Sequence, residues 1–544
     1  MNLILIKRHT FTLRIPGWRL LVLLGCAVFI AGAGISDAQS LDPSTGKDLS
    51  MGASPAGAGA SPAVRASDEP IKVTVTGAIL SAFENNRLLK VRRLNPEITR
   101  MAEEVERAVF DPVLTGGVDF SVERVPANQR TAVSDSSVTG DEQNLSGKIS
   151  QFFASGTRVN AGVSLNRTDA PPSVEQYESR AGLSVTQALL RGASREANLA
   201  NLSQARLDTH MSQYELRGFS EALLAQVEGT YWDYALSRQQ IETVEESLKL
   251  AEQQEKETRE IISVGKLAET EIIASQAEIA SRRQDLINAR STMAAIKLQL
   301  LRLINPSGPN LWQRDILLVD APSAPAVNIE DPATHVQLAL QMRPDWNQAR
   351  MELQQEDLEI VKTKNGLLPK LDLFVTLGKT GYAESFGGSV SDVADDRFDL
   401  LAGISLELPL GNRSATALHR RSLLRREQAE KALENLSQLI ELDVRTAIIE
   451  VNRARLQITA TLETRKLQEE KLRVETEKFR VGKSTNLLVA QAQRDLLASQ
   501  LSEDRVIVSY LKALIGLYRL EGSLLERRGI SAPGRNPPEP VAKK

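Results

Sequence analysis

The fold of this chain follows from two short stretches of sequence: Ile261-Ile262-Ser263-Val264-Gly265-Lys266 and Phe479-Arg480-Val481-Gly482-Lys483-Ser484. Each stretch interrupts a long, charge-rich helical pattern. A glycine between two helical runs lets the backbone reverse, so each Val-Gly-Lys triplet predicts the turn of a helical hairpin. For either copy alone, a loop glycine in an ordinary coiled coil is the alternative. Two copies in matching contexts favour hairpins, with incoming helices roughly 100 Å long and outgoing helices roughly 60 Å long.

The surroundings of the two turns are also duplicated. Ala82-Phe83-Glu84-Asn85-Asn86 is echoed by the run that begins at Ala339, and Phe110-Asp111-Pro112 is echoed by Leu367-Leu368-Pro369. An internal repeat of this size means that one structural unit occurs twice. We therefore predict a mixed fold, in which a unit of helix, strands, long helix and return helix is duplicated.

Between the first helix and the long helix of each unit, the sequence alternates between apolar and polar residues, which predicts strands. The expected strands are Val113–Val125, Leu145–Phe153, Arg158–Asn166, Arg180–Ala188, Lys370–Tyr382 and Phe398–Leu410. In the last of these, Leu400, Ala402 and Ile404 form an apolar face, and Ser405 and Glu407 belong to the other. One apolar and one polar face at this length is typical of a transmembrane β-barrel, although a half-buried sheet in a soluble domain has the same pattern. Open strand edges cannot lie in lipid, so we expect several copies of the chain to pool their strands.

The N-terminus predicts export. Basic residues precede an apolar run over residues 20–35, and Ser36-Asp37-Ala38 offers a cleavage site, as in a secretory signal peptide. We expect cleavage after Ala38. The alternative is a lipobox that ends at Cys26, the single cysteine of the chain, which would leave Cys26 lipidated.

Composition agrees with long exposed helices more than with a thick globular core. Aromatic residues make up 4% of the 544 residues, charged residues 25%, and the formal net charge is −3. No basic patch interleaved with aromatic residues is present, so nucleic acid is not an expected partner. The expected organisation is a signal peptide (1–38), a flexible leader (39–70), a first repeat (71–304), a linker (305–331), a second repeat (332–525) and a disordered tail (526–544).

Taken together, these features resemble the outer membrane efflux proteins, the TolC-like family. The run from Leu183 to Gly192 is similar to that family's strand-to-helix junction, and Pro409-Leu410-Gly411 is its counterpart in the second repeat. Phe479 and Gly482, followed by residues 487–491, resemble the family's second turn. The resemblance covers about residues 70–525. It implies a homotrimer in which each copy gives four strands to a shared twelve-stranded barrel in the outer membrane, continued by an α-helical barrel across the periplasm. The pair of segments between Leu145 and Asn166 is extra and leaves the strand count open.

Catalytic chemistry is not predicted. The four histidines are scattered, and we find no cysteine pair, glycine-rich phosphate loop or cluster with metal-ligand spacing. We therefore expect no enzyme activity, no cofactor and no metal site.

The resemblance implies that the hairpin turns form the periplasmic mouth of a passive exit duct. Its partners would be outer membrane lipid, a periplasmic adaptor (membrane fusion protein) and an inner-membrane transporter, in efflux or type I secretion. The adaptor-docking residues are then Val264, Gly265, Lys266, Val481, Gly482 and Lys483. The candidate gate residues are Glu269, Glu271, Arg480 and Ser484. For the two glutamates, the simpler interpretation is that they stabilise the positive end of a helix dipole. The alternative function is a periplasmic coiled-coil structural or adaptor protein without a pore.

Overall fold

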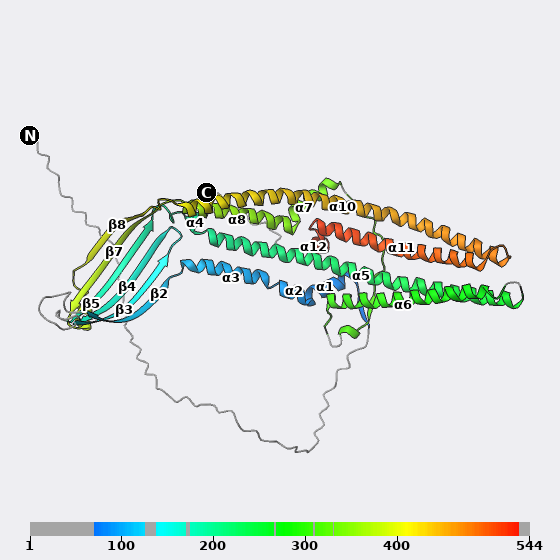
Figure 1. Cartoon of the computed structure of the whole chain (residues 1–544), viewed down its shortest axis with the longest axis horizontal. Coiled ribbons are helices and arrows are strands. Elements are labelled where there is room, and N and C mark those ends of the chain that lie inside the picture. Colours follow the sequence, from blue (N-terminus) through cyan, green and yellow to red (C-terminus); the bar gives the residue numbers. More distant parts are fainter. Residues whose placement is uncertain are drawn as a thin grey trace, which may run out of the picture. The chain divides into compact units, whose positions relative to one another are not determined.

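The computed structural model describes residues 70–125, 138–169, 175–265, 268–307, 311–329 and 331–531, which belong to one compact unit (Figure 1). The predicted signal peptide lies outside these residues, as do almost all of the predicted leader and most of the predicted tail. The first half contains β1 (Ile71–Val73), α1 (Val75–Asn85), α2 (Arg87–Arg92), α3 (Asn95–Arg107), η1 (Ala108–Phe110), β2 (Val113–Val125), β3 (Val138–Phe152), β4 (Thr157–Asp169), β5 (Gln176–Ala188), α4 (Arg195–Asn198), α5 (Ala200–Ser263) and α6 (Glu271–Ile304). The second half contains η3 (Leu311–Gln313), β6 (Ile316–Leu318), α7 (Pro332–Met342), α8 (Pro344–Gly366), β7 (Lys370–Ala383), α9 (Phe386–Asp392), β8 (Asp399–Glu407), α10 (Arg413–Arg480), α11 (Asn486–Leu520) and α12 (Leu524–Arg527).

A six-stranded antiparallel sheet carries all the predicted long strands, in the order β2-β3-β4-β5-β7-β8. The strand count that the sequence left open is therefore six in this sheet, two more than the four that the family resemblance implies. The extra pair forms the strands β3 and β4, which lie inside the sheet between β2 and β5. Among the described residues, β2 and β8 each have one edge without a neighbouring strand.

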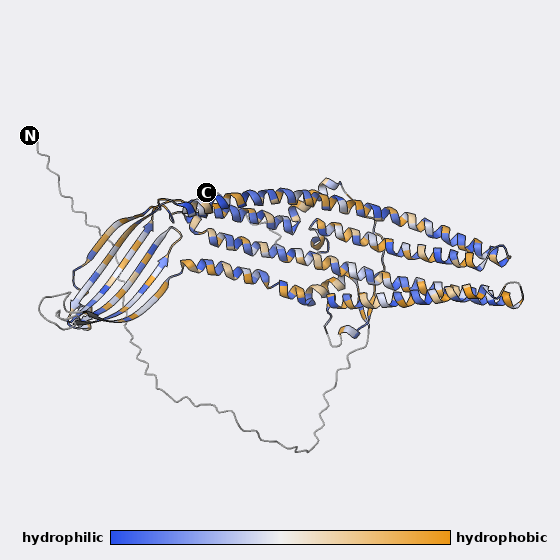
Figure 2. Cartoon of the chain, viewed as in Figure 1, coloured by the Kyte–Doolittle hydropathy of each residue, from blue (hydrophilic) through white to orange (hydrophobic). Residues whose placement is uncertain are grey.

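Paired residues in an antiparallel sheet lie on the same face, so the register assigns every side chain to one of two faces. We call the first the apolar face. Its exposed large apolar residues are Leu114, Val118, Phe120, Val122, Leu145, Ile149, Val163, Leu183, Leu373, Val375, Leu377, Leu400, Ile404 and Leu406. The opposite, polar face carries mainly charged, hydroxyl and amide side chains, including Asp119, Ser121, Asn144, Lys148, Arg158, Asn160, Ser164, Arg180, Thr376, Asp399, Ser405 and Glu407. The colour changes along the strands in Figure 2 follow this alternation.

The helices form a layer that continues from the sheet (Figure 1). Next to the strands, neighbouring helices pack in the order α3, α5, α8, α10, and beyond α3 and α8 in the order α6, α5, α11, α10. The long helices α5 and α10 contain 64 and 68 residues, so each is about 100 Å long. No helix in the described ranges carries an apolar stretch long enough to cross a membrane.

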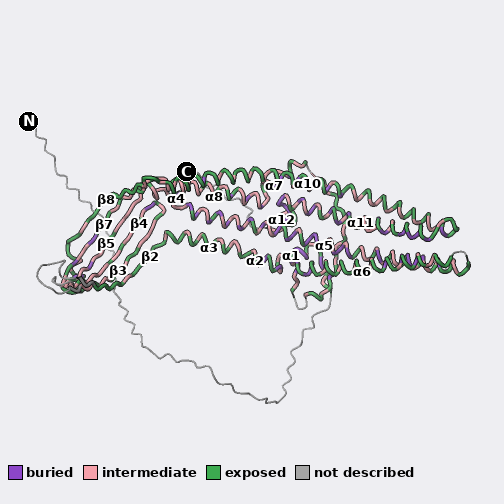
Figure 3. Tube along the Cα trace, viewed as in Figure 1, coloured by how far each residue is buried: buried purple, intermediate pink, exposed green. Residues whose placement is uncertain are grey.

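A hydrophobic core lies in the middle of the helical layer, around the short parallel pair β1–β6. Leu224 of α5, Leu301 of α6 and Leu525 of α12 are fully buried there. The buried Tyr231 hydroxyl donates to the backbone oxygen of Val73 at 3.1 Å, which ties α5 to β1. The predicted tail does not begin at residue 526, because helix α12 extends over that residue. Arg528, which follows α12, donates to the Glu228 carboxylate of α5 at 2.5 Å. Figure 3 shows that burial is concentrated in α5 and α11, while α10 is exposed along much of its length.

Candidate functional site: the hairpin tips

Both predicted turns are helix C-terminal caps with the same geometry. Gly265 and Gly482 each have φ of +75°, a left-handed conformation in which a β-carbon costs energy. The Gly482 N–H donates to the Phe479 oxygen at 2.9 Å and the Lys483 N–H to the Lys478 oxygen at 2.8 Å, the two bonds of a Schellman motif. A β-carbon at either glycine would meet no atom within 4 Å. The glycines are therefore needed for backbone conformation and not for close packing.

The tips present apolar side chains to solvent. Val264 and Val481 hold matching positions, and each is 66% exposed. Lys483 is also exposed, while Lys266 lies outside the described residues. The two turns therefore expose a valine at equivalent places.

Three of the candidate gate residues have defined surroundings. Glu271 is the first residue of α6 and is partly buried. Ser484 donates to Glu475 at 2.8 Å, and hydrogen bonds from Lys478 and then Ser484 lower the pKa of Glu475. Arg480 lies 3.2 Å from Glu477 and 3.8 Å from Glu257, which joins α10 to α5.

The fourth candidate, Glu269, is exposed in the turn before α6. Within the chain, Arg480 therefore pairs with Glu257 and Glu477, and no ion pair joins it to Glu271 among the described residues.

Asn486, which the sequence analysis did not single out, connects the two hairpins at the tip. It is the first residue of α11 and is 1% exposed. Its side-chain nitrogen donates to the hydroxyl of Ser275 at 2.6 Å and to the backbone oxygen of Glu271 at 3.2 Å. A polar run such as Ser484-Thr485-Asn486 after a turn is typical of a helix start. The partners of Asn486 belong to the other repeat, however, and cannot be predicted from spacing.

A second connection that the sequence did not reveal lies further along the same two helices. Glu278 of α6 is buried and pairs with the buried Arg282 one turn away. Its second oxygen accepts from Arg494 of α11 at 2.9 Å. The (i, i+4) spacing of Glu278 and Arg282 indicates a helical pair, but only packing of α6 on α11 brings in Arg494. We call Asn486–Ser275 and Glu278–Arg494 the tip latch, because both contacts join one hairpin to the other.

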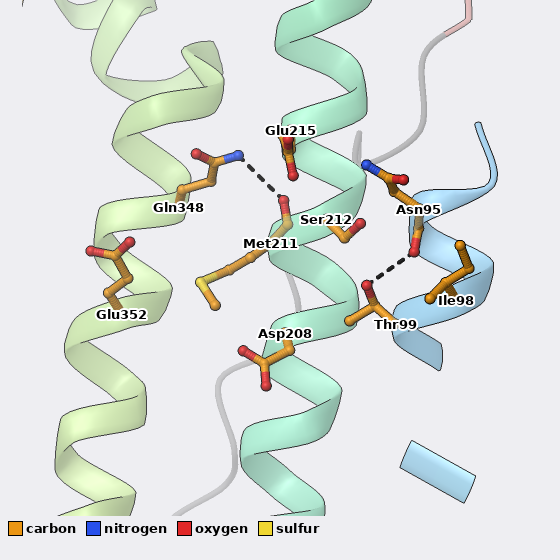
Figure 4. A pocket seen from close by; sticks show the side chains of 9 residues that line it. All are labelled: Asn95, Ile98, Thr99, Asp208, Met211, Ser212, Glu215, Gln348 and Glu352. Carbon is orange, nitrogen blue, oxygen red and sulfur yellow. Dashed lines mark hydrogen bonds between the residues drawn. The ribbon is translucent and has the colours of Figure 1, made fainter. Parts of the chain in front are cut away.

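Near the sheet, α3, α5 and α8 border a groove that contains three acidic side chains (Figure 4). Asp208 accepts from Gln355 at 2.6 Å, and Glu215 pairs with Arg92 at 3.2 Å. Gln348 donates to the Met211 oxygen at 3.3 Å. These contacts hold helices together. Within the described ranges, no group of three or more His, Cys, Asp or Glu residues has the geometry to hold a metal ion.

Comparison with known proteins agrees with this architecture. A family model described as outer membrane efflux protein matches residues 335–523. The chain is similar to the toluene efflux pump outer membrane protein TtgC of Pseudomonas putida, with 23% identity over 470 residues that cover 83% of each chain.

Two solved structures show the same fold. The CmeC outer membrane channel of Campylobacter jejuni matches with a TM-score of 0.62 at 13% identity, covering 85% of this chain and 87% of that one. The outer membrane protein VceC of Vibrio cholerae matches with a TM-score of 0.61 at 15% identity, covering 82% and 96%.

Proposed function

Since this chain belongs to the outer membrane efflux protein (TolC-like) family, we propose that it is the outer membrane exit duct of a tripartite efflux pump. In this proposal three copies form one passive, non-enzymatic channel that extends from the outer membrane into the periplasm. An adaptor would connect its mouth to an inner-membrane transporter. Similarity to the toluene efflux protein supports efflux more than type I secretion.

The observation that carries the proposal is the apolar face of the six-stranded sheet. Its large side chains are well exposed, with Leu114 at 76%, Phe120 at 73% and Ile404 at 66%. A contiguous apolar surface of this extent would be unfavourable in water. A barrel with this face toward lipid and the polar face toward the lumen satisfies both surfaces.

The sheet edges support closure by several copies. β2 runs away from the helices and β8 runs back toward them, so β2 of one copy can pair antiparallel with β8 of the next. Such pairing removes the open edges that lipid does not tolerate. Closure of this kind uses two different surfaces of each copy, which form a ring when the rotation closes.

The helices at the two edges of the helical layer lie on the same sides of the copy as the two edge strands. Helices α3 and α6 lie on the β2 side of the layer, and α10 lies on the β8 side. In α10, the exposed residues Leu442, Ile449 and Leu456 recur every seven residues, as in a coiled-coil seam. On the other side, Ile98 of α3 and Ile287 of α6 are 66% and 68% exposed. Burial of these apolar stripes between neighbouring copies would stabilise the same ring of copies that β2–β8 pairing forms.

The hairpin tips then form the periplasmic mouth, in which Val264, Gly265, Val481, Gly482 and Lys483 would contact the adaptor. Their exposure and the matched turn geometry support this role. Lys266, which follows Gly265 in the sequence, is included in this proposed docking set.

We assign the gate to Glu269, Glu271, Arg480 and Ser484. The backbone oxygen of Glu271 accepts a hydrogen bond from Asn486, which belongs to the tip latch. A movement of one hairpin relative to the other would therefore also move the Glu271 carboxylate.

The competing function is a periplasmic coiled-coil protein without a pore. The exposed apolar face of the sheet argues against it. Fractionation of cells and gel analysis with and without heating would separate the two. A heat-modifiable trimer in the outer membrane fraction supports the duct, whereas a water-soluble protein in the periplasmic fraction would refute it.

A further inference from the structure

We propose that the β3–β4 hairpin is a membrane-spanning part of the barrel wall, so that three six-stranded sheets form a barrel of 18 strands with a correspondingly wide lumen. This inference rests on the trimeric duct proposed above. It concerns how wide the outer membrane segment is and therefore how bulky a solute can pass through it.

The register is the first support. β3 pairs with β2 along the whole length of β2, from Val113↔Ser150 to Val125↔Val138. β4 pairs with β5 over twelve positions, from Thr157↔Gln187 to Thr168↔Gln176. The hairpin therefore covers the same height as its neighbours, because paired strands in one sheet share their position along the barrel wall.

The side-chain pattern of the hairpin is the second support. Leu145 and Ile149 of β3 and Val163 of β4 lie on the apolar face and are 48%, 50% and 60% exposed. Asn160 and Ser164 of β4 lie on the polar face. An elaboration in water would not need a solvent-exposed apolar band that continues those of β2 and β5. A wall strand needs this alternation.

The turn of the hairpin is held at the end of the sheet from which the helices start. The Asn198 side chain donates to the Ala154 oxygen at 2.9 Å and to the Gly192 oxygen at 2.7 Å. Gly156 has φ of +79°, and a β-carbon there would lie 2.1 Å from the Gly192 oxygen. These contacts hold the turn against the junction between β5 and α4. The two strands therefore start at the same level as their neighbours and do not extend from the outer rim.

The lumen size follows from barrel geometry. With strands about 4.8 Å apart and tilted by about 40°, 12 strands give a backbone radius of about 12 Å and 18 strands give about 18 Å. Four helices per copy next to the sheet make a ring of 12 in a trimer, and an interaxial distance of about 9–10 Å gives that ring a radius of about 18 Å. The 18-stranded barrel thus has about the same radius as the helical ring, whereas the radius of a twelve-stranded barrel would be smaller by about one third.

Site-directed spin labelling tests the placement of the hairpin in the full chain in lipid vesicles. Single cysteines replace Val163 and Ser164 in β4, and Ile404 and Ser405 in β8 serve as the matched reference pair. Cys26 is the single cysteine of the chain, and under the expected cleavage after Ala38 it leaves no background thiol; if Cys26 is instead lipidated, its sulfur is blocked. We expect Val163→Cys and Ile404→Cys to collide preferentially with oxygen dissolved in lipid, and Ser164→Cys and Ser405→Cys with a water-soluble nickel chelate.

The outcomes of this experiment separate the two proposals. If both β4 labels are in water while Ile404→Cys is in lipid, the hairpin is not in the wall and only the inference fails. If Ile404→Cys is also in water, the outer membrane function itself fails.

Deletion of residues 138–169 tests the width. The remaining strands β2 and β5 keep their apolar residues on one face, because Val118 and Leu183 are both in register with that face. Electron cryomicroscopy should show 18 strands for the full chain. In planar bilayers, we measure the hydrodynamic radius of the largest polyethylene glycol that enters the channel from the extracellular side. This radius should be smaller by about 6 Å for the deletion variant than for the full chain. Equal polymer cut-offs, or 12 strands in the full chain, would overturn the inference. The strand count of the full chain decides if the deletion variant does not fold.

Discussion

Replacement of Arg494 by Met should loosen the closed mouth of the duct. The substitution removes the 2.9 Å bond to Glu278 but keeps the apolar part of the side chain. Glu278 is buried and retains Arg282, so it is not left as an isolated buried charge. The substitution therefore removes one interaction between the two hairpins, the ion pair between Arg494 and Glu278.

The magnitude follows from exposure and symmetry. The Arg494 side chain is 48% exposed, so solvent screens the pair and we assign it about 1 kcal/mol. If three copies open together, the sum is about 3 kcal/mol, or about a 150-fold change in the ratio of open to closed mouths. The purified trimer in planar bilayers should then spend much more time in its high-conductance state.

Arg283→Met is the matched control. Arg283 pairs with Glu252 at 3.2 Å; this pair is more exposed than Arg494–Glu278 and joins α5 to α6 within one hairpin. Its loss should not change gating. The reasoning is refuted if Arg494→Met conducts like the wild type, or if Arg283→Met opens the channel to the same degree.

Three further predictions concern the tips and the core. Gly482→Val places a β-branched residue at φ +75°, which costs about 1–2 kcal/mol locally. Efflux in a drug-susceptibility assay should be lost, while cross-linking should still detect trimers. Loss of the trimer would instead show that Gly482 is needed for folding. Charge reversal by Glu271→Lys should change single-channel conductance and its block by divalent cations, and wild-type behaviour of both would remove Glu271 from the gate. Burial raises the pKa of Glu221 to about 8, although the positive charge of Arg217 opposes this shift. The folded chain therefore favours the protonated carboxyl group. The free energy of unfolding should decrease as the pH rises from about 4.5 to about 8. Denaturant titrations should show this loss in the wild type and a flatter profile in Glu221→Gln; equal pH profiles would contradict it.

Features that depend on local interactions could be predicted from the amino-acid sequence alone. A glycine between two helical runs predicts a C-terminal cap, and both Gly265 and Gly482 adopt it with the same positive φ. Strand alternation is equally local, because neighbouring side chains on a strand point to opposite faces. The predicted strand positions, including Val113–Val125, therefore agree with the sheet.

Which helices and strands are neighbours, in contrast, depends on how the whole chain packs. Alternation around residues 145–166 predicts strands but not their neighbours, and only the pairing with β2 and β5 places these strands inside the sheet. The tip latch is similar, since Asn486 and Ser275 are more than 200 residues apart in the sequence. Arg480 has acidic residues near it in sequence and in space, and helix packing determined that its partner on the other hairpin is Glu257. Such contacts form between helices and strands brought together by the duplicated fold, so no spacing within one segment of the chain encodes them.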